Sequence, residues 1–154
     1  MPRLFLDMDG VLADFDGHYE AVFGHPRRRG SGWADVRTVQ DFYFHIPPMP
    51  DMLELWEFCA PYTPTVLTGT PSTVSQARNN KHRWVETWLP PGTPIICCSA
   101  RGKSMFMKPG DVIVDDHDEY RHLWEEKGGI WVLHTSAKDS IKQLKKILAI
   151  IPAG

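Results

Sequence analysis

Apolar residues along the 154-residue chain gather into five short runs separated by longer, more polar stretches. Each run is too short for a helix and is rich in Val, Ile or Leu, which is typical of parallel strands buried on both faces. The pattern predicts strands over Leu4–Leu6, Thr65–Leu67, Pro94–Cys98, Val112–Val114 and Ile130–Leu133.

Amphipathic segments lie between most of these runs and predict helices. Their apolar residues return at helical spacing, with polar residues on the opposite face. The predicted helices span residues 51–60, 72–89, 118–127 and 136–151. Alternating strands and helices indicate an α/β fold, in which helices cover a doubly wound, Rossmann-like, mostly parallel five-stranded sheet.

The segment after the first predicted strand breaks this alternation. Residues 16–49 contain glycines, prolines, a basic cluster and several aromatic residues, where a tight turn into a helix is expected. We interpret the segment as a small helical cap inserted into the chain. The sequence therefore predicts a core domain of residues 1–15 and 50–154 and a cap of residues 16–49.

Composition and charge narrow the class of protein. Apolar residues make up 42% of the chain, charged residues make up 23%, and the net charge is -2. Because neither sign dominates, a general nucleic-acid or membrane-surface binder is disfavoured, and no apolar run is long enough to span a bilayer. The N-terminus carries no signal-peptide pattern, and Cys59, Cys97 and Cys98 lack the spacing of a disulfide framework or a zinc site. We expect a cytoplasmic protein with reduced, mostly buried thiols.

Acidic residues follow two of the predicted strands. Asp7 and Asp9 come after the first strand, and Asp115 and Asp116 come after the fourth. Ligands of open α/β sheets bind at the carboxyl ends of the strands, and four carboxylates there would repel one another without a cation. Oxygen ligands suit a hard ion such as Mg²⁺, which pairs with phosphate. An anion beside this cation would be bound by the Thr68 hydroxyl, the main-chain amides after it and a lysine. This combination indicates phosphoryl transfer to a carboxylate.

Four stretches carry a family resemblance, in order along the chain: "DMDGVLADF", "LTGT", a lysine and "DVIVDD". Together they resemble the four motifs of the haloacid dehalogenase superfamily of phosphatases. Three longer stretches, "FHIPPMPDMLELW", "KPGDVIVDD" and "GGIWVLHTS", resemble the 5'(3')-deoxyribonucleotidase-like group. The resemblance covers most of the chain and is weakest in the cap.

The resemblance implies a Mg²⁺-dependent phosphatase that works in two steps. Asp7 would attack phosphorus to form an aspartyl-phosphate, and Asp9 would protonate the leaving oxygen and then activate water. Asp7, the main-chain carbonyl of Asp9 and Asp115 would hold the metal, with Asp116 close by. Thr68 would bind the transferring phosphoryl group.

Lys103 and Lys108 are both candidates for the lysine that binds phosphate, which the family pattern places before the fourth motif. Motif spacing favours Lys103 over Lys108, for which the alternative is a solvated turn residue. A third lysine, Lys81, lies on the polar side of the second predicted helix and is a further alternative. His117 stands where relatives often carry arginine, and its titration near neutrality bears on the pH optimum.

Aromatic residues in and beside the predicted cap are candidates for holding the rest of the substrate. Phe15, just after the first motif, is the first choice by resemblance. Trp33, Phe42, Tyr43 and Phe44 either stack a nucleobase or form the core of the cap. The full set of predicted substrate-binding residues is Phe15, Phe42, Phe44, Thr68, Gly69, Thr70 and Lys103.

The sequence thus predicts a hydrolase of small phosphate esters, with a nucleoside or deoxynucleoside monophosphate as the favoured substrate. Alternatives are a phosphatase of polynucleotide ends or sugar phosphates, and a non-catalytic binding module on the same scaffold. Arg27–Arg29 would serve a polynucleotide, although a charge run in a Gly-rich loop is more often solvated. A homodimer is compatible with the sequence, and no membrane partner is expected.

Overall fold

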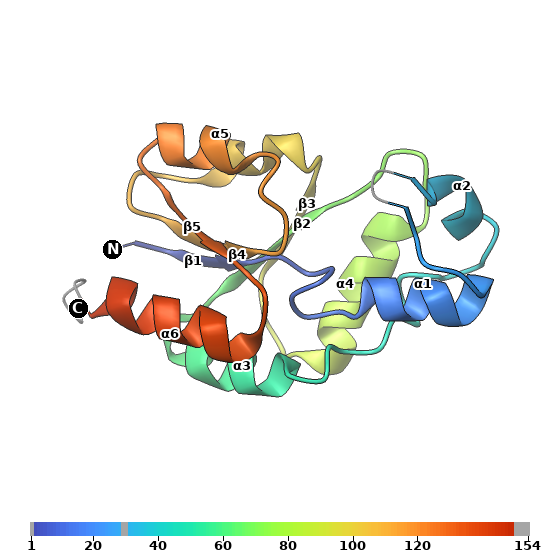
Figure 1. Cartoon of the computed structure of the whole chain (residues 1–154), viewed down its shortest axis with the longest axis horizontal. Coiled ribbons are helices and arrows are strands. Elements are labelled where there is room, and N and C mark those ends of the chain that lie inside the picture. The colour runs from blue at the N-terminus through green and yellow to red at the C-terminus, as the bar shows by residue number, and fades with distance from the viewer. Residues whose placement is uncertain (1, 29–30, 150–154) are drawn as a thin grey trace.

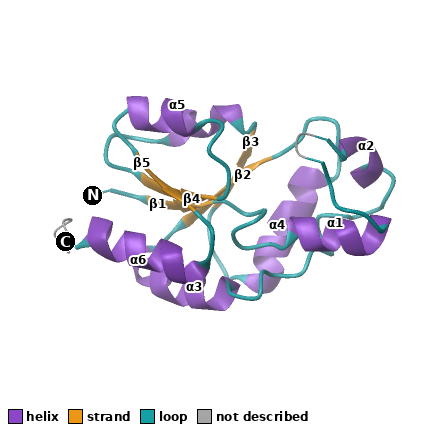
Figure 2. Ribbon diagram, in the orientation of Figure 1, coloured by secondary structure: helices purple, strands orange, loops and turns teal. Residues whose placement is uncertain are grey.

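The computed structural model describes residues 2–28 and 31–149. Five parallel strands form one sheet in the order β3-β2-β1-β4-β5. The sheet runs through the molecule between helices on both faces (Figure 1), and loops join the two kinds of element (Figure 2). The predicted doubly wound α/β fold is confirmed. Its strands are β1 (Leu4–Leu6), β2 (Thr65–Gly69), β3 (Ile95–Cys98), β4 (Val112–Asp115) and β5 (Ile130–Leu133).

The helices connect these strands. They are α1 (Phe15–Phe23), α2 (Trp33–Val36), α3 (Met52–Cys59), α4 (Ala77–Trp88), α5 (Arg121–Glu126) and α6 (Ala137–Leu148), with 3₁₀ segments η1 (Ala60–Tyr62) and η2 (Arg101–Phe106). Two helices begin several residues later than predicted: α4 at Ala77 and α5 at Arg121. Before α4 the chain carries several Ser and Thr residues, whose side chains favour turns over helix. The predicted last residue of the final helix, Ile151, lies outside the described residues, and no helix among the described ones is long and apolar enough to cross a bilayer.

Side chains alternate between the two faces of the sheet, and each face has its own core. Leu4 and Leu6 of β1 belong to the larger core, which also contains residues of α3, α4 and α6. Phe5 points to the other face, where its ring lies 5.6 Å from that of Trp124 of α5. Figure 1 shows α3 and α6 on one side of the sheet and α5 on the other. The strands are short and apolar because both of their faces are covered.

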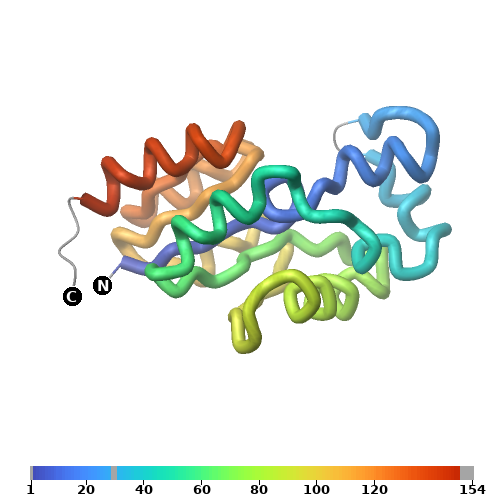
Figure 3. The backbone as a smooth tube through the Cα atoms, turned by 90° about the horizontal axis from the view of Figure 1, so that it is seen from below, coloured from blue at the N-terminus to red at the C-terminus, as the bar shows by residue number. Residues whose placement is uncertain are grey.

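The segment between β1 and α3 contains α1 and α2, which lie together at one end of the molecule (Figure 3). Asp14 caps the N-terminus of α1, because its side chain accepts a hydrogen bond from the main-chain N–H of Gly17 at 3.1 Å. The Tyr19 hydroxyl donates to Asp35 Oδ2 at 2.5 Å and so joins the two helices. The segment is helical as predicted, and its separation as a cap at residues 16–49 stays a prediction.

Asp111 ties the start of β1 to the start of β4. Its buried carboxylate accepts hydrogen bonds from the main-chain N–H groups of Arg3 (2.9 Å) and Lys108 (2.7 Å) and pairs with Arg3 Nη2 at 2.7 Å. Burial alone would raise the pKa of Asp111, but these contacts outweigh burial and lower it. Because the folded-state pKa is lowered, Asp111 stabilises the fold above about pH 4, and this contribution is lost as the pH falls through the folded-state pKa.

We predict that Asp111→Asn lowers the free energy of unfolding by about 1–3 kcal/mol at pH 7, since two buried N–H groups lose a charged acceptor. The difference from the parent protein should begin to shrink below about pH 4, where the unfolded parent chain becomes protonated at Asp111, and should be lost below the lowered folded-state pKa. Urea unfolding at pH 7 and pH 3 measures both values, with the exposed Glu57→Gln as the control. An equal loss at both pH values would contradict this account.

Candidate active site

The ends of β1 and β4 bring three carboxylates together. The two strands are parallel neighbours, with Leu6 paired to Val114, so the residues that follow them in register reach the same edge of the sheet. One carboxylate oxygen from each of Asp7, Asp115 and Asp116 lies within 4.8 Å of the others. The structure thus joins three of the predicted site residues in one group, which we call the acidic cluster.

Lys103 of η2 lies between two of these carboxylates. Its Nζ donates to Asp7 Oδ1 at 2.9 Å and to Asp115 Oδ2 at 2.8 Å. Burial opposes the charge of Lys103, but the two carboxylates outweigh burial and raise its pKa above the usual value, so it stays cationic. Lys108, the alternative, is exposed, and its main-chain N–H donates to Asp111 away from the cluster. Of these two lysines, the structure brings Lys103 to the site.

The acidic cluster holds more negative charge than one lysine balances. Burial, and then the charge of Asp7, raise the pKa of Asp115 to about 6. Burial, and then the charges of Asp7 and Asp115, raise the pKa of Asp116 to about 9. Asp116 Oδ1 is buried and has no hydrogen-bond partner among the described residues. Hard oxygen donors under mutual repulsion, one of them unpartnered, fit a divalent cation such as Mg²⁺.

Gly10 makes room for this arrangement. The turn after β1 is closed by the Met8 carbonyl, which accepts hydrogen bonds from the main-chain N–H groups of Leu12 (2.8 Å) and Ala13 (2.9 Å). Within the turn Gly10 has φ 82°, a left-handed conformation that favours glycine. A Cβ at this position would overlap the carboxylate of Asp116. Glycine is therefore needed both for the turn and for the place of Asp116.

The side chain of Asp9 turns away from the acidic cluster. Its Oδ2 accepts a hydrogen bond from Lys81 Nζ at 2.9 Å. Lys81 comes from α4, is fully buried, and also donates to Thr68 Oγ1 (2.8 Å) and to the Gly69 carbonyl (2.8 Å). Lys81, the third candidate for the phosphate-site lysine, therefore joins the turn that contains Asp9 to the end of β2. Lys81 therefore fixes one oxygen of the Asp9 carboxylate away from the acidic cluster.

Thr68 does not border the cavity of the site, and its contact with a phosphoryl group stays a prediction. It is fully buried within β2, and Lys81 occupies its hydroxyl. Gly69 and Thr70, which follow it at the tip of the strand, do line the cavity. Thr70 Oγ1 is buried without a hydrogen-bond partner among the described residues. Thr70 therefore brings an unpartnered hydroxyl to the edge of the cavity.

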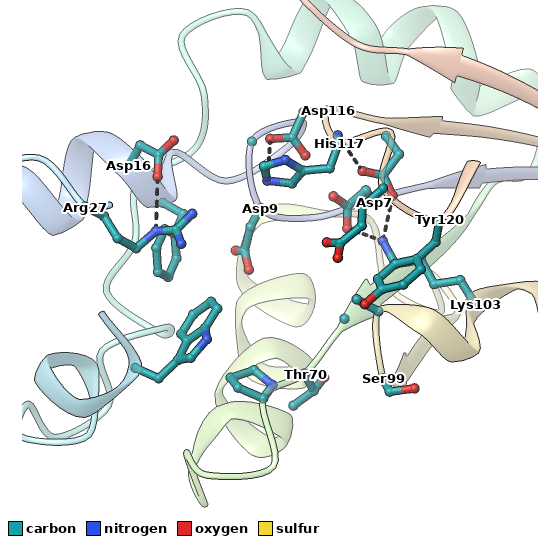
Figure 4. A pocket seen from close by; sticks show the side chains of 18 of the residues that line it. Asp7, Asp9, Asp16, Arg27, Thr70, Ser99, Lys103, Asp116, His117 and Tyr120 are labelled. Atoms are coloured by element: carbon teal, nitrogen blue, oxygen red, sulfur yellow. Dashed lines mark hydrogen bonds and ion pairs between the residues drawn. The ribbon is translucent and has the colours of Figure 1, made fainter. Parts of the chain in front are cut away.

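A cavity of about 450 Å³ opens beside these groups, within the usual range for small-molecule sites (Figure 4). Asp7, Asp9, Lys103 and Asp116 border it, and so does His117, whose Nε2 lies 3.6 Å from Asp116 Oδ2. Buried polar atoms without partners are uncommon in folded proteins. Several such atoms among the described residues belong to the lining of this cavity, which indicates a polar ligand. They are Asp9 Oδ1, Arg27 Nε, Thr70 Oγ1, Asp116 Oδ1 and Trp131 Nε1.

Two of the five predicted aromatic residues line the cavity, whereas Phe42, Tyr43 and Phe44 do not. Phe15 and Trp33 border it. Phe42 is buried behind Phe15, with the two ring centroids 5.6 Å apart, so it forms part of the core. Phe44 is half-buried beneath the guanidinium of Arg83, whose Cζ lies 4.0 Å from the ring centroid. Neither Phe42 nor Phe44 is placed to touch a ligand in this cavity.

Sequence reasoning missed several lining residues. Arg27 belongs to a run expected to be solvated, yet its side chain is only 11% exposed and borders the cavity. Arg28 is exposed as expected, and Arg29 lies outside the described residues. Ser99 and Tyr120 also border the cavity. Ser99 directly follows β3, so the rule that ligands bind at the carboxyl ends of strands could have identified it. No such signal marks Arg27.

Known proteins resemble this chain in structure, whereas no family model and no curated protein matches it in sequence. A HAD family hydrolase from Deinococcus radiodurans R1, crystallised with bound phosphate and sodium, matches with a TM-score of 0.51 and 12% identity, over 97% of this chain and 95% of that one. The L-2-haloacid dehalogenase from Xanthobacter autotrophicus matches with a TM-score of 0.49 and 13% identity, over 100% and 85% of the two chains. At such identity, the likeness to the D. radiodurans hydrolase establishes a shared fold.

The position of Gly10 allows a test of the acidic cluster. We predict that Gly10→Ala weakens the binding of Mg²⁺ or Mn²⁺ by about tenfold or more, the usual cost of displacing a group that orients a metal ligand. The matched control is Gly24→Ala, which has nearly the same backbone strain (φ 81°) but nothing within 4 Å of the added methyl group. Calorimetric titration of both variants measures the affinity. Equal weakening in both would attribute the effect to backbone strain and not to Asp116.

Proposed function

We propose that this protein is a Mg²⁺-dependent phosphomonoesterase of the haloacid dehalogenase type that acts on nucleoside monophosphates. The observation that carries the proposal is the placement of Lys103 between Asp7 and Asp115, beside Asp116 and at the wall of a cavity. A carboxylate held by a cation next to further hard oxygen donors is suited to attack phosphorus. The D. radiodurans hydrolase of the same fold binds a phosphate and a sodium ion, which agrees with this chemistry.

The acidic cluster would hold the metal. Asp7, Asp115 and Asp116 would supply carboxylate oxygens, and the main-chain carbonyl of Asp9 would complete the protein ligands, as the family resemblance implies. When bound, Mg²⁺ neutralises charge on the phosphoryl oxygens and on the carboxylates around it. Lys103 and the Thr70 hydroxyl add a cation and a hydrogen-bond donor for the same oxygens.

In the first step, Asp7 acts as the nucleophile. One of its carboxylate oxygens forms a bond to phosphorus while the ester P–O bond breaks, giving an aspartyl-phosphate and an alcohol. Asp7 is only 6% exposed, and Lys103 fixes one of its oxygens at 2.9 Å. The nucleophile therefore loses little freedom when the substrate binds, which lowers the entropic barrier.

Asp9 transfers the protons in both steps. In the first step its protonated carboxyl group gives a proton to the leaving alcohol oxygen. In the second step its carboxylate takes a proton from water, whose oxygen attacks phosphorus and displaces Asp7. Asp9 Oδ2 is anchored by Lys81 at 2.9 Å, and Oδ1 has no partner among the described residues, so Oδ1 is the atom left to move the proton.

A nucleoside monophosphate fits the cavity better than the alternative substrates. The volume of about 450 Å³ suits a molecule of this size, and the half-buried Trp33 ring offers apolar contact for a base. A sugar phosphate has no flat heterocycle to lie against the Trp33 ring. For a polynucleotide, the basic run would have to be free, but Arg27 packs against the rings of the cavity wall.

The proposal predicts phosphate release from nucleoside monophosphates that stops when a chelator removes the metal. Asp7→Asn should lower turnover below detection without unfolding the protein, because it removes the nucleophile and leaves the core intact. Phosphate assays on ribo- and deoxynucleoside monophosphates, sugar phosphates and 3'-phosphorylated oligonucleotides measure this, with the exposed Glu57→Gln as the control. Full activity in Asp7→Asn would refute the covalent mechanism, and release confined to oligonucleotides or sugar phosphates would refute the substrate class.

The role of Asp9 predicts a dependence on the leaving group. Asp9→Asn should slow hydrolysis of alkyl esters such as nucleotides by about a hundredfold or more, the usual contribution of general acid–base catalysis. The rate of the first step should fall less for p-nitrophenyl phosphate, because its phenolate leaves without protonation. Rapid-quench measurement of the first step for both substrates tests this. Equal losses for the two substrates would exclude Asp9 as the acid.

A further inference from the structure

Arg27 is built into the wall of the cavity by aromatic contacts. Its Cζ lies 5.0 Å from the centroid of the Phe15 ring and 5.3 Å from that of Trp33. Arg27 follows α1, Phe15 begins α1 and Trp33 begins α2, so three separate places in the chain form this contact. Cation–π packing of this kind fixes the plane of a guanidinium. Figure 4 shows Arg27 and Lys103 on opposite sides of the cavity, with Asp9 between them.

The hydrogen-bonding capacity of Arg27 is only partly used. Its Nη1 donates to the Ser31 carbonyl at 3.3 Å. Its Nε is buried and has no hydrogen-bond acceptor among the described residues. Asp16 Oδ1 lies 3.6 Å from Nε, too far for a hydrogen bond, and the Asp16 side chain is 77% exposed. A buried, unpartnered donor in the wall of a cavity indicates an acceptor on the ligand.

We propose that Arg27 is a specificity-determining residue that reads a pair of adjacent acceptor atoms on the base of the substrate and so favours guanine over adenine. This inference rests on the proposed function, because it assumes that the phosphoryl group lies at the acidic cluster. The rest of the molecule then extends toward Arg27. Guanine presents O6 and N7 side by side, and the fork of an arginine matches this edge with two hydrogen bonds.

Adenine and a second phosphate fit this wall less well. Adenine places its N6 amino group beside N7, so one N–H of Arg27 would face another donor. A second phosphate would meet the carboxylate of Asp16 close to the guanidinium, and like charges repel. The half-buried Trp33 ring also gives the wall an apolar surface, which suits an aromatic heterocycle and not a hydrated anion.

The test compares the ratio of kcat/KM for guanosine and adenosine 5'-monophosphate in the parent protein and in variants of Arg27. Arg27→Lys keeps the charge but loses the fork, and Arg27→Met keeps an apolar stem of similar length. We expect the parent to favour guanosine monophosphate by about 10-fold to 100-fold, and both variants to bring the ratio close to one. Arg28→Met, at the exposed neighbouring position, is the matched control and should retain the parent ratio.

Three results would overturn the inference. The first is a parent protein without base preference. The second is an Arg27→Lys variant that keeps the preference, which would mean that base recognition depends on the positive charge and not on the paired N–H groups of the guanidinium. The third is an equal decrease in kcat/KM for both nucleotides in the Arg27 variants, which would reduce Arg27 to a structural role.

A separate measurement distinguishes failure of the inference from failure of the proposed function. If the parent protein released no phosphate from any ester, the proposed function would fall. Calorimetric binding of the two monophosphates would then decide on Arg27 alone. Tighter binding of guanosine monophosphate that is lost in Arg27→Lys would still support base reading, and equal binding of the two nucleotides would exclude it.

Discussion

Repulsion among the carboxylates at the ends of β1 and β4 is the constraint on which the rest of the site depends. At about 4 Å, two like charges near a protein surface repel by roughly 4 kcal/mol. Lys103 offsets part of this repulsion by contacting Asp7 and Asp115 together. Burial and the remaining charge raise the pKa of Asp116 to about 9. A divalent cation at this place would offset the remaining repulsion.

Two lysines give the neighbouring acids Asp7 and Asp9 different surroundings. Asp7 faces the acidic cluster and Lys103, whereas Asp9 faces Lys81 from α4. Lys81 lies 4.8 Å above the Tyr43 ring and also contacts the end of β2. The segment between β1 and α3, the core helix α4 and the sheet therefore meet at the carboxylate of Asp9. Under the proposed mechanism, these separate environments are what allow one acid to attack and the other to move protons.

The parts of the structure that sequence reasoning predicted correctly are those fixed by local pattern. The five strands appear where short apolar runs predicted them, and Asp7, Asp115 and Asp116 meet because parallel strands end at one edge of the sheet. The start of α4 was predicted five residues early, since local turn preferences compete with the helical pattern there. Thr68 and Thr70 look equivalent in the sequence, but strand β2 buries the first beside Lys81 and leaves the second at the tip.

By itself, the sequence determined the α/β fold, the edge of the sheet where polar side chains gather and the acidic residues that lie there. These follow from periodicity and from the position of polar residues at strand ends, which are properties of neighbouring residues. Only the tertiary structure decided that Phe42 belongs to the core, that Lys81 holds Asp9, and that Arg27 lies between Phe15 and Trp33 at the cavity wall. Each of those contacts joins residues from separate elements, and which side chains meet depends on how the elements pack.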